Sequence, residues 1–518
     1  MDNKALQVNV TTDKNYDSEF CGSIPLHLVN LIQPHGLLLV IDKDQLRVVQ
    51  ASENITQVLG KPIEDILDKT LSEFIPANQY EDLIAKMSLL NDQGKLIFTI
   101  TLNAEQQQNH YTALLNLREE YILIELEEIA YLPAEANFIK LYQQTKYVTS
   151  LLKQAQDTAE TAIITAEEIK KLTGFDRVLV YQFDAQWNGL VIAQAKEQEM
   201  DDFMGLRFPA SDVPKQAREL YFRNPYRLIP NRDYVPVRLL PVINPLTQRF
   251  TDLSDCTLRS IAPVHLEYLA NMNVMASMSL PIIIDNKLWG LIACHHRTDK
   301  NPSYELRAAL ELLSDIVATQ LAAKERENAI LLRAKLGEVH GSLLEQLYNS
   351  QVLGESLLEG KINMMNLLDL TGVAILHDGN SWMEGQSPSS QEVKELASWL
   401  RRNNLDKVFS TNSLATHYSN SIAYAAVASG LIAIPINTEQ GEFILGFRAE
   451  VLQTLQWSGN PDNAIQMEPD GKTYHPRNSF ASYMQTVKHT SLPWHPEEVQ
   501  AAENLRNAVL GKILKDRY

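Results

Sequence analysis

The chain has 518 residues, of which 45% are hydrophobic and 21% are charged, and it carries a formal net charge of −18 at pH 7. A chain of this length is too long for one hydrophobic core, and we expect about three domains with the composition of soluble globular protein. The acidic balance argues against non-specific binding of nucleic acid, and no run approaches the ~18 consecutive apolar residues of a membrane span.

The N-terminal arm, residues 1–26, is polar and contains Cys21 followed by Gly22. It lacks the basic and apolar regions of a secretory signal. Cys21, Cys256 and Cys294 are an odd number of cysteines with neither metal-ligand spacing nor a disulfide framework, so we expect a reducing cytoplasm. A thiol on such an arm is accessible to covalent attachment of a ligand, and an incidental surface cysteine is the alternative.

Residues 27–135 predict a mixed domain of strands and short helices. Apolar runs at 36–41 and 46–51 flank the turn residues 42–44, which predicts a strand pair. Further strands are expected at 96–102 and 121–127, and short helices at 62–67, 71–75 and 80–90. This arrangement suits a PAS-type sensor fold.

A helix is expected over 138–172, ended by Gly174, and strands over 177–183 and 189–195. The stretch 208–218 then places Asp212 between Pro209 and Pro214, which restrict the backbone on either side. A carboxylate held this rigidly suggests a placed charge or acceptor. The alternative is a helix N-cap at the start of a helix over 213–223.

Residues 224–245 are rich in proline and long for a loop without regular structure, which indicates function or a packed insertion. A helix is expected over 260–271, with His265 and Tyr268 on one face. Two apolar runs, 275–284 and 288–295, surround the polar turn 285–287 and predict a hairpin that ends at His295 and His296.

No proline occurs between 303 and 387, and apolar residues recur at helical spacing from Leu306 through Leu310, Leu313, Val317 and Leu321. The pattern predicts a helix of roughly 45 residues, about 65 Å long, that joins two domains and offers an apolar seam to a dimer. A core helix interrupted near Gly337 and Gly341 is the alternative.

The hairpin pattern recurs at 428–436 and 442–448, which predicts a second, related α/β domain. Residues 447–490 are polar and bury little by themselves. They predict a hairpin extension toward a neighbour, with a solvated loop as the alternative. Residues 494–518 predict a closing helix.

Together these features resemble the photosensory module of phytochromes, the bilin-binding red-light receptors. The resemblance implies an α+β fold of three sensor domains (PAS, GAF and a GAF-like PHY domain) with central antiparallel sheets, a long helical spine, and an N-terminal arm knotted through the GAF domain. The implied domains are the arm at 1–26, PAS at 27–135, GAF at 136–322, and PHY at 323–518 with a tongue at about 447–490. The motifs that carry the resemblance are Cys21, Pro34-His35-Gly36, the stretch from Pro209 to Pro214, Arg259-Ser260, His265, the stretch from Trp289 to His296, Trp457, and Pro476-Arg477-Asn478-Ser479-Phe480.

The resemblance assigns a linear tetrapyrrole to the GAF-like domain. Family members attach it either to a cysteine on the arm, for biliverdin, or to a cysteine directly before the helix histidine, for other bilins. Val264 precedes His265 and cannot form a thioether, so biliverdin attached to Cys21 is implied. Cys256 and Cys294 match neither attachment position.

The resemblance also implies roles for the residues around the bilin. Arg227 and Arg259 would bind its propionates, helped by Ser277 and Ser279. His265 and Asp212 would face the pyrrole nitrogens, and His295 the ring-D carbonyl. The aromatic wall near ring D would comprise Tyr181, Phe203, Phe208 and Tyr268, with ordinary core packing as the alternative for Phe203 and Phe208, where the family often has tyrosine.

The implied function is reversible red/far-red light sensing by photoisomerisation of the bilin. Asp212 would pair with Arg477 of the tongue motif, which also contains Ser479, and loss of the pair would release the tongue and shift the spine. The expected partners are the bilin, a second copy of the chain along the spine, and an output kinase or response regulator beyond the chain.

Two other classes of protein remain as alternatives. One is a GAF-type sensor of a small ligand such as a cyclic nucleotide, which leaves Cys21 and the Arg477 motif without a role. The other is an enzyme acting on tetrapyrroles, but no set of nucleophile and base, metal spacing or phosphate-binding loop supports catalysis. We therefore expect the chain not to be an enzyme.

Overall fold

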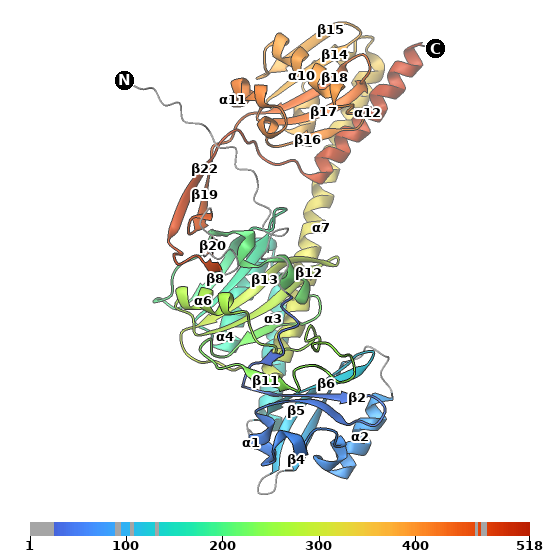
Figure 1. Cartoon of the computed structure of the whole chain (residues 1–518). Coiled ribbons are helices and arrows are strands. Elements are labelled where there is room, and N and C mark those ends of the chain that lie inside the picture. The colour runs from blue at the N-terminus through green and yellow to red at the C-terminus, as the bar shows by residue number, and fades with distance from the viewer. Residues whose placement is uncertain are drawn as a thin grey trace. The chain divides into compact units, whose positions relative to one another are not determined.

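The computed structural model describes residues 25–88, 95–103, 108–129, 134–461, 465–467 and 474–517, so Cys21 lies outside the described residues. The chain mixes helices and strands, which confirms the predicted α+β class, and it divides into two compact units (Figure 1). The first is Met1–Ala322 with Gln456–Tyr483, and the second is Ala323–Leu455 with Met484–Tyr518. None of the described helices combines the length and apolar character needed to cross a bilayer.

The first sheet of the first unit has seven strands in the order β1-β11-β3-β2-β6-β5-β4. The predicted pairing of 36–41 with 46–51 is confirmed, because the buried strands β2 and β3 are antiparallel neighbours. The sequence analysis missed β5, which forms hairpins with both β4 and β6. The elements of this domain are β1 (Leu31–Ile32), β2 (Leu37–Asp42), β3 (Val48–Ser52), α1 (Ile55–Leu59), two 3-10 turns at Ile63–Asp65 and Leu71–Glu73, α2 (Ala77–Met87), β4 (Lys95–Asn103), β5 (Gln108–Leu117) and β6 (Tyr121–Glu128).

The proline-rich segment 224–245 is more regular than its composition predicts. It contains β10 (Arg227–Ile229), which joins the second sheet, and β11 (Val237–Leu240), which pairs with β1 and β3 of the first. Backbone groups between the prolines are satisfied in this way by strand pairing. The described start of the chain lies against the neighbouring loop, since Gln33 N donates to Leu258 O at 2.8 Å. The predicted knot involves residues before 25 and stays a prediction.

The second sheet of the chain has eight strands in the order β10-β12-β13-β7-β8-β9-β19-β22. The predicted hairpin of β12 with β13 is confirmed. Side chains of β7 alternate between two cores, with Val178 and Val180 on one face and Leu179 and Tyr181 on the other. The strands are β7 (Arg177–Phe183), β8 (Gly189–Lys196), β9 (Arg207–Phe208), β12 (Ala276–Ile284), β13 (Lys287–His296), β19 (Gln453–Ser458) and β22 (Ser482–Val487).

The single helix expected over 138–172 is wrong, because two helices stand there: α3 (Ala134–Gln154) and α4 (Thr158–Thr173). The Asp157 carboxylate caps α4 by accepting a hydrogen bond from Glu160 N at 2.8 Å. Glu160 in turn accepts from Gln156 N at 2.6 Å. Asp followed three residues later by Glu marks the start of a helix, and this signal was overlooked because the segment contains no proline. Gly174 ends α4 in the left-handed conformation, as predicted.

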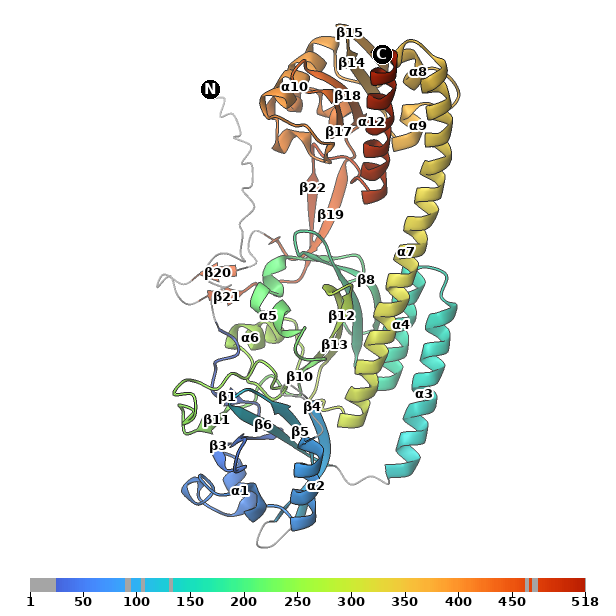
Figure 2. The same ribbon diagram turned by 90° about the vertical axis from the view of Figure 1, so that its right-hand side faces the viewer.

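Helix α7 (Tyr304–Asn349) is continuous over 46 residues. The alternative of a helix interrupted near Gly337 and Gly341 is therefore wrong. The seam residues Leu310, Leu313, Val317 and Leu321 are buried against α3, α4 and the second sheet, so they are not available to a dimer (Figure 2). The apolar side chains that α7 does expose are others, namely Leu312, Ile330, Leu331 and Tyr348.

The second unit has a five-stranded sheet in the order β15-β14-β18-β17-β16, which confirms the predicted repetition of the hairpin as β17 with β18. The tongue is a hairpin extension and not a solvated loop: β19 neighbours β22, and the short β20 (Ile465–Met467) pairs with β21 (Tyr474–Pro476). The remaining elements are α8 (Leu353–Leu358), α9 (Met364–Leu368), β14 (Gly372–His377), β15 (Asn380–Gly385), α10 (Ser390–Arg402), β16 (Phe409–Thr411), α11 (Ala425–Ala428), β17 (Gly430–Asn437), β18 (Glu442–Arg448) and α12 (Pro496–Arg517).

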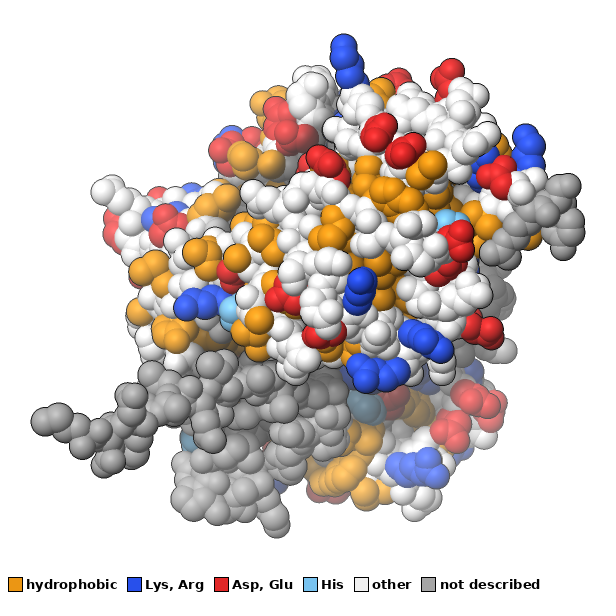
Figure 3. Space-filling model, turned by 90° about the horizontal axis from the view of Figure 1, so that it is seen from above, with side chains coloured by type: hydrophobic (Ala, Val, Ile, Leu, Met, Phe, Trp, Pro, Cys, Tyr) orange, Lys and Arg blue, Asp and Glu red, His pale blue; other side chains and the backbone are white. Residues whose placement is uncertain are grey.

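The face of the molecule seen in Figure 3 carries acidic, basic and apolar side chains interspersed with one another. Such a mixed surface does not by itself indicate a partner. The candidate site therefore has to be sought in the interior of the domains.

Alanine substitution at two glycines should change the free energy of unfolding in opposite directions. A Cβ at Gly290 in β13 would lie 2.2 Å from the carbonyl oxygen of Tyr181, whereas a Cβ at Gly337 in α7 would meet nothing within 4 Å. Gly290→Ala should lower the free energy of unfolding by about 1–3 kcal/mol, because the neighbouring strand must move. Gly337→Ala should raise it by about 0.5–1 kcal/mol, because alanine loses less backbone entropy in a helix. Urea unfolding of both variants tests this, and equal effects would contradict it.

Candidate functional site

One face of the second sheet and helix α6 (Pro263–Asn271) line a partly open cavity of about 90 Å³. The cavity brings together eight of the predicted binding residues: Tyr181, Phe208, Asp212, His265, Tyr268, Ser277, Ser279 and His295.

Asp212 lies in a single 3-10 turn, Ala210–Asp212, directly before α5 (Lys215–Leu220). The residue at the N-cap of α5 is Pro214, so the alternative of Asp212 as a helix cap is wrong. One carboxylate oxygen of Asp212 accepts from the Tyr268 hydroxyl at 2.9 Å and from Arg477 Nη2 at 2.6 Å. Burial raises the pKa of the Asp212 carboxyl, and the charge of Arg477 and the hydrogen bond of Tyr268 act against that rise.

Arg477 follows β21 in the tongue and forms a buried ion pair with Asp212, the two side chains being 3% and 7% exposed. Its guanidinium also lies 4.7 Å from the ring centre of Phe480 and 5.2 Å from that of Phe208. The backbone oxygen of Arg477 accepts from Asn271 of α6 at 3.2 Å. The tongue is thus held beside α6 and the cavity by the Asp212–Arg477 pair, by the Asn271 hydrogen bond and by a contact of His475 Nδ1 with Glu267 at 2.9 Å.

Ser479 lies apart from this pair. It is exposed, and its hydroxyl oxygen accepts from Ala481 N at 3.4 Å. Among the predicted switch residues, the described structure therefore joins only Asp212 and Arg477.

His265 and His295 are both neutral in the cavity. Burial, and next the charge of Arg227, lower the pKa of His265 to about 3. Burial and the charge of Arg177 lower the pKa of His295 well below its usual value. Arg177 Nη2 lies 3.0 Å from His295 Nδ1. Because a guanidinium can only donate, Nδ1 accepts, and the ring proton of His295 is on Nε2, where it can serve as a hydrogen-bond donor.

Arg227 and Arg259 line a second, smaller cavity that shares Tyr221 with the first. Within the part of the chain that the structure describes, neither forms an ion pair with a carboxylate, and Arg227 Nε has no hydrogen-bond partner. Burial, and next the charge of Arg227, lower the pKa of Arg259 to about 10. The Arg259 side chain is buried and that of Arg227 is half-buried, and burying a guanidinium without a nearby carboxylate is costly, which indicates a site for an anionic ligand.

Three family models match the chain: a PAS fold over residues 21–129, a GAF domain over 157–324 and the phytochrome region over 336–518. Cyanobacterial phytochrome B of a Nostoc species is 37% identical over 98% of this chain and 68% of its own length. The crystal structure of a bacteriophytochrome from R. palustris aligns with a TM-score of 0.86 and 32% identity over 96% of this chain and 99% of that one. The photosensory core module of the Stigmatella aurantiaca phytochrome aligns with a TM-score of 0.84 and 35% identity over 96% and 98%.

The chain belongs to the phytochromes. It is a PAS–GAF–PHY photosensory module, as its motifs indicate. The chain spans about two thirds of the length of the cyanobacterial relatives, with 68% of the first and 66% of the second.

The aromatic wall of this phytochrome differs in part from the prediction. Tyr181 and Phe208 line the cavity with ring centres 5.8 Å apart. Phe203 does not line it but packs behind Phe208 and beneath the Arg177 guanidinium, so core packing describes it better. The Tyr181 hydroxyl is buried without a hydrogen-bond partner among the described residues, as expected of a polar group that awaits a ligand.

The sequence analysis missed three residues of the site. Arg177 orients His295, and its only signal is a charge at the start of an apolar strand. The Tyr221 hydroxyl lies 2.7 Å from the Ser279 hydroxyl, across the boundary between the two cavities. Phe480 packs edge-on against Tyr268 at 5.1 Å, although only Arg477 and Ser479 of its motif were predicted to act in the switch.

Proposed function

We propose that this phytochrome module binds biliverdin in its GAF domain, attached by a thioether to Cys21, and that the bilin senses red and far-red light. The chain is a light photoreceptor module by its family membership. The observation that carries the choice of ligand is the pair of guanidiniums, Arg227 and Arg259, which have no carboxylate partner among the described residues and lie beside a cavity lined by neutral histidines. A cyclic-nucleotide sensor is not favoured, since it gives the Asp212–Arg477 pair no role.

The residues of both cavities fit a linear tetrapyrrole with two propionates. Arg227 and Arg259 would pair with the propionates, and Ser277 and Ser279 would donate hydrogen bonds to them. A neutral His265 and the backbone carbonyl of Asp212 would accept from the pyrrole nitrogens, and His295 Nε2 would donate to a ring carbonyl. A bound bilin supplies the absorption of red light and an isomerisable double bond.

The attachment to Cys21 is supported by the state of the other two thiols. Cys256 and Cys294 are 2% and 0% exposed, so neither is accessible. Burial raises the pKa of Cys294 to about 12 and that of Cys256 well above its usual value, which leaves both as unreactive thiols. Residue 264 is valine, so the attachment position on the helix is absent.

The Asp212–Arg477 pair would carry the change in the cavity to the tongue. Loss of the pair leaves a buried carboxylate and a buried guanidinium without partners, so the tongue residues near Arg477 would leave the cavity. The tongue returns to the second unit through β22, and from there α12 reaches the end of the described chain.

The wider system is proposed as follows. The domains are the arm at 1–26, PAS at 27–135, GAF at 136–322 and PHY at 323–518, in the cytoplasm. Exposed apolar residues of α7 form a homodimer interface, and an output kinase or response regulator receives the signal. The module itself would not catalyse a reaction.

The first experiment is an absorption spectrum of the chain mixed with biliverdin, before and after red light and again after acid denaturation. We expect a red band that photoconverts and stays with the protein on denaturation. Cys21→Ala should bind pigment that denaturation releases, whereas the control Cys294→Ala should keep it attached. Unchanged absorbance of free biliverdin would overturn the bilin proposal, and retention of pigment by Cys21→Ala would overturn the linkage alone.

A further inference from the structure

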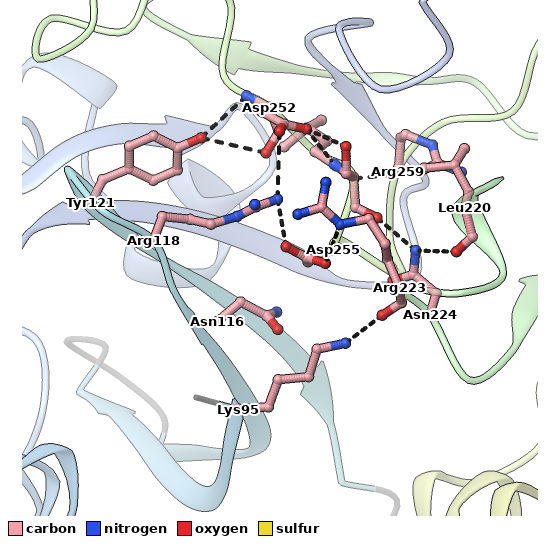
Figure 4. A network of polar contacts seen from close by, with 12 residues as sticks. Lys95, Asn116, Arg118, Tyr121, Leu220, Arg223, Asn224, Asp252, Asp255 and Arg259 are labelled. Carbon is pink, nitrogen blue, oxygen red and sulfur yellow. Dashed lines mark hydrogen bonds and ion pairs between the residues drawn. The ribbon is translucent and has the colours of Figure 1, made fainter. Parts of the chain in front are cut away.

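The hairpin of β5 and β6 in the PAS domain holds a loop of the GAF domain that ends at Arg259 (Figure 4). At the turn of the hairpin, Arg118 pairs with Asp255 at 2.5 Å. The Tyr121 hydroxyl accepts from the backbone nitrogen of Asp252 at 3.2 Å. These contacts anchor the beginning and the middle of the loop 252–259.

The end of the loop is held by Glu125 in the middle of β6. One of its carboxylate oxygens accepts three hydrogen bonds: from Thr257 N at 2.7 Å, from Thr257 Oγ1 at 2.6 Å and from Leu258 N at 2.9 Å. Its other oxygen accepts from Asn116 at 3.2 Å. Glu125 is 2% exposed, so these bonds do not compete with solvent. Burial raises the pKa of the Glu125 carboxyl, and the hydrogen bonds from Thr257 and Leu258 act against that rise.

Arg259 directly follows this anchored backbone. On its other side, Ser260 N donates to Leu31 O at 2.9 Å, so the main chain is held both before and after the arginine. The side chain of Arg259 reaches the small cavity and makes one long hydrogen bond, from Nη1 to Leu253 O at 3.4 Å. Its own contacts therefore constrain the guanidinium weakly, and the direction in which it points depends on the backbone that Glu125 holds.

We propose that Glu125 of the PAS domain is a positioning residue for the bilin, which orients Arg259 toward a propionate through the backbone of Thr257 and Leu258. The inference rests on the proposed function, since it assigns Arg259 to a propionate. It gives the PAS domain an indirect part in ligand binding, although none of its described residues lines either cavity.

Glu127, two residues further along β6, shows that this role is specific to Glu125. Its carboxylate binds Arg307 at the start of α7, with Nη1 to Oε1 at 2.9 Å, and not the loop before Arg259. Glu128 is exposed on the same strand and offers a matched control for a change from glutamate to glutamine.

The test uses Glu125→Gln in the full chain. Glutamine keeps the shape but has one acceptor oxygen and no charge, so the bonds from Thr257 and Leu258 lose their charge assistance and become weaker. In the protein without biliverdin, hydrogen exchange of these two amides should accelerate by roughly tenfold or more. Glu128→Gln should leave it unchanged. Thr257→Val, which removes one donor from the opposite side, should produce a smaller acceleration in the same direction.

The second experiment measures the binding of biliverdin. Every variant in it also carries Cys21→Ala, so that binding is reversible. Glu125→Gln should raise the dissociation constant by roughly tenfold and shift the red absorption band, and Arg259→Gln should do the same. In the Arg259→Gln background, Glu125→Gln should have less than about a twofold further effect, because both act through the same guanidinium. Glu128→Gln should bind as the parent does.

Each outcome decides between the possibilities. Faster exchange with unchanged affinity, or effects of Glu125→Gln and Arg259→Gln that multiply, would make Glu125 a purely structural residue and overturn the inference. If the parent fails to bind biliverdin at all, the proposed function fails. This result can be told apart from failure of the inference, because the hydrogen-exchange experiment needs no pigment.

Discussion

Arg477→Gln is expected to lower the free energy of unfolding of the first unit by about 3–5 kcal/mol and to release the tongue from the cavity. The carboxylate of Asp212 is 7% exposed and has Arg477 as its charged partner at 2.6 Å. Removal of one partner of a buried pair leaves the other charge uncompensated, which costs far more than the pair contributes. Thermal or urea unfolding measures the loss, and hydrogen exchange of residues 474–481 measures the release.

The double variant Asp212→Asn with Arg477→Gln separates the ion pair from general damage. It should recover a large part of the lost stability, because no charge then remains buried, while the tongue stays released. Arg333→Gln is the matched control: Arg333 pairs with Glu497 at 3.3 Å but is 68% exposed, so its loss should cost less than about 1 kcal/mol. If Arg477→Gln were no more costly than this control, the pair would not hold the tongue.

Arg227→Gln is expected to have opposite effects on stability and on ligand binding. Without biliverdin the variant should be at least as stable as the parent, because a half-buried cation that repels Arg259 has been removed. Its affinity for biliverdin should fall by roughly 10- to 100-fold, since a charge-assisted hydrogen bond contributes about 1.5–3 kcal/mol. Melting of the protein without pigment and a titration with biliverdin, both in the Cys21→Ala background, measure the two effects.

The control for this prediction is Arg223→Gln. Arg223 is 45% exposed and already pairs with Asp255, so its loss should change neither the affinity nor the stability of the protein by much. A marked loss of stability in Arg227→Gln without pigment would show that Arg227 has a structural partner. Unchanged affinity would remove it from the propionate site.

The site could be predicted where a short motif has one local conformation. Pro209 and Pro214 restrict the backbone around Asp212, and the sequence already indicated a placed carboxylate there. The histidines and serines of β12 and β13 could also be placed, because alternation along a strand puts Ser277 and Ser279 on one face. The pairing of Asp212 with Arg477, 265 positions away, came from family resemblance and not from any local signal.

Other features could not be predicted because they depend on partners distant in the chain. Phe203 and Phe208 look alike in sequence, yet only Phe208 lines the cavity. Arg177 contacts His295 across the pairing of β7 with β13, a register that no local pattern reveals. The apolar residues of α7 have the spacing of a coiled-coil seam, but the domain core covers those between 310 and 321.

The sequence by itself determined the β2–β3 and β12–β13 hairpins and the long helix α7, because strand alternation and helical spacing act within a few residues. Family resemblance pointed to Cys21 as the thiol proposed for attachment, since valine precedes His265. The tertiary structure alone decided which charges are buried together and which are buried alone. The reason is that burial depends on groups brought in from other strands and domains. Folding places Arg477 beside Asp212 and Glu125 beside the loop that precedes Arg259, whereas it places no carboxylate beside Arg227 or Arg259 among the described residues.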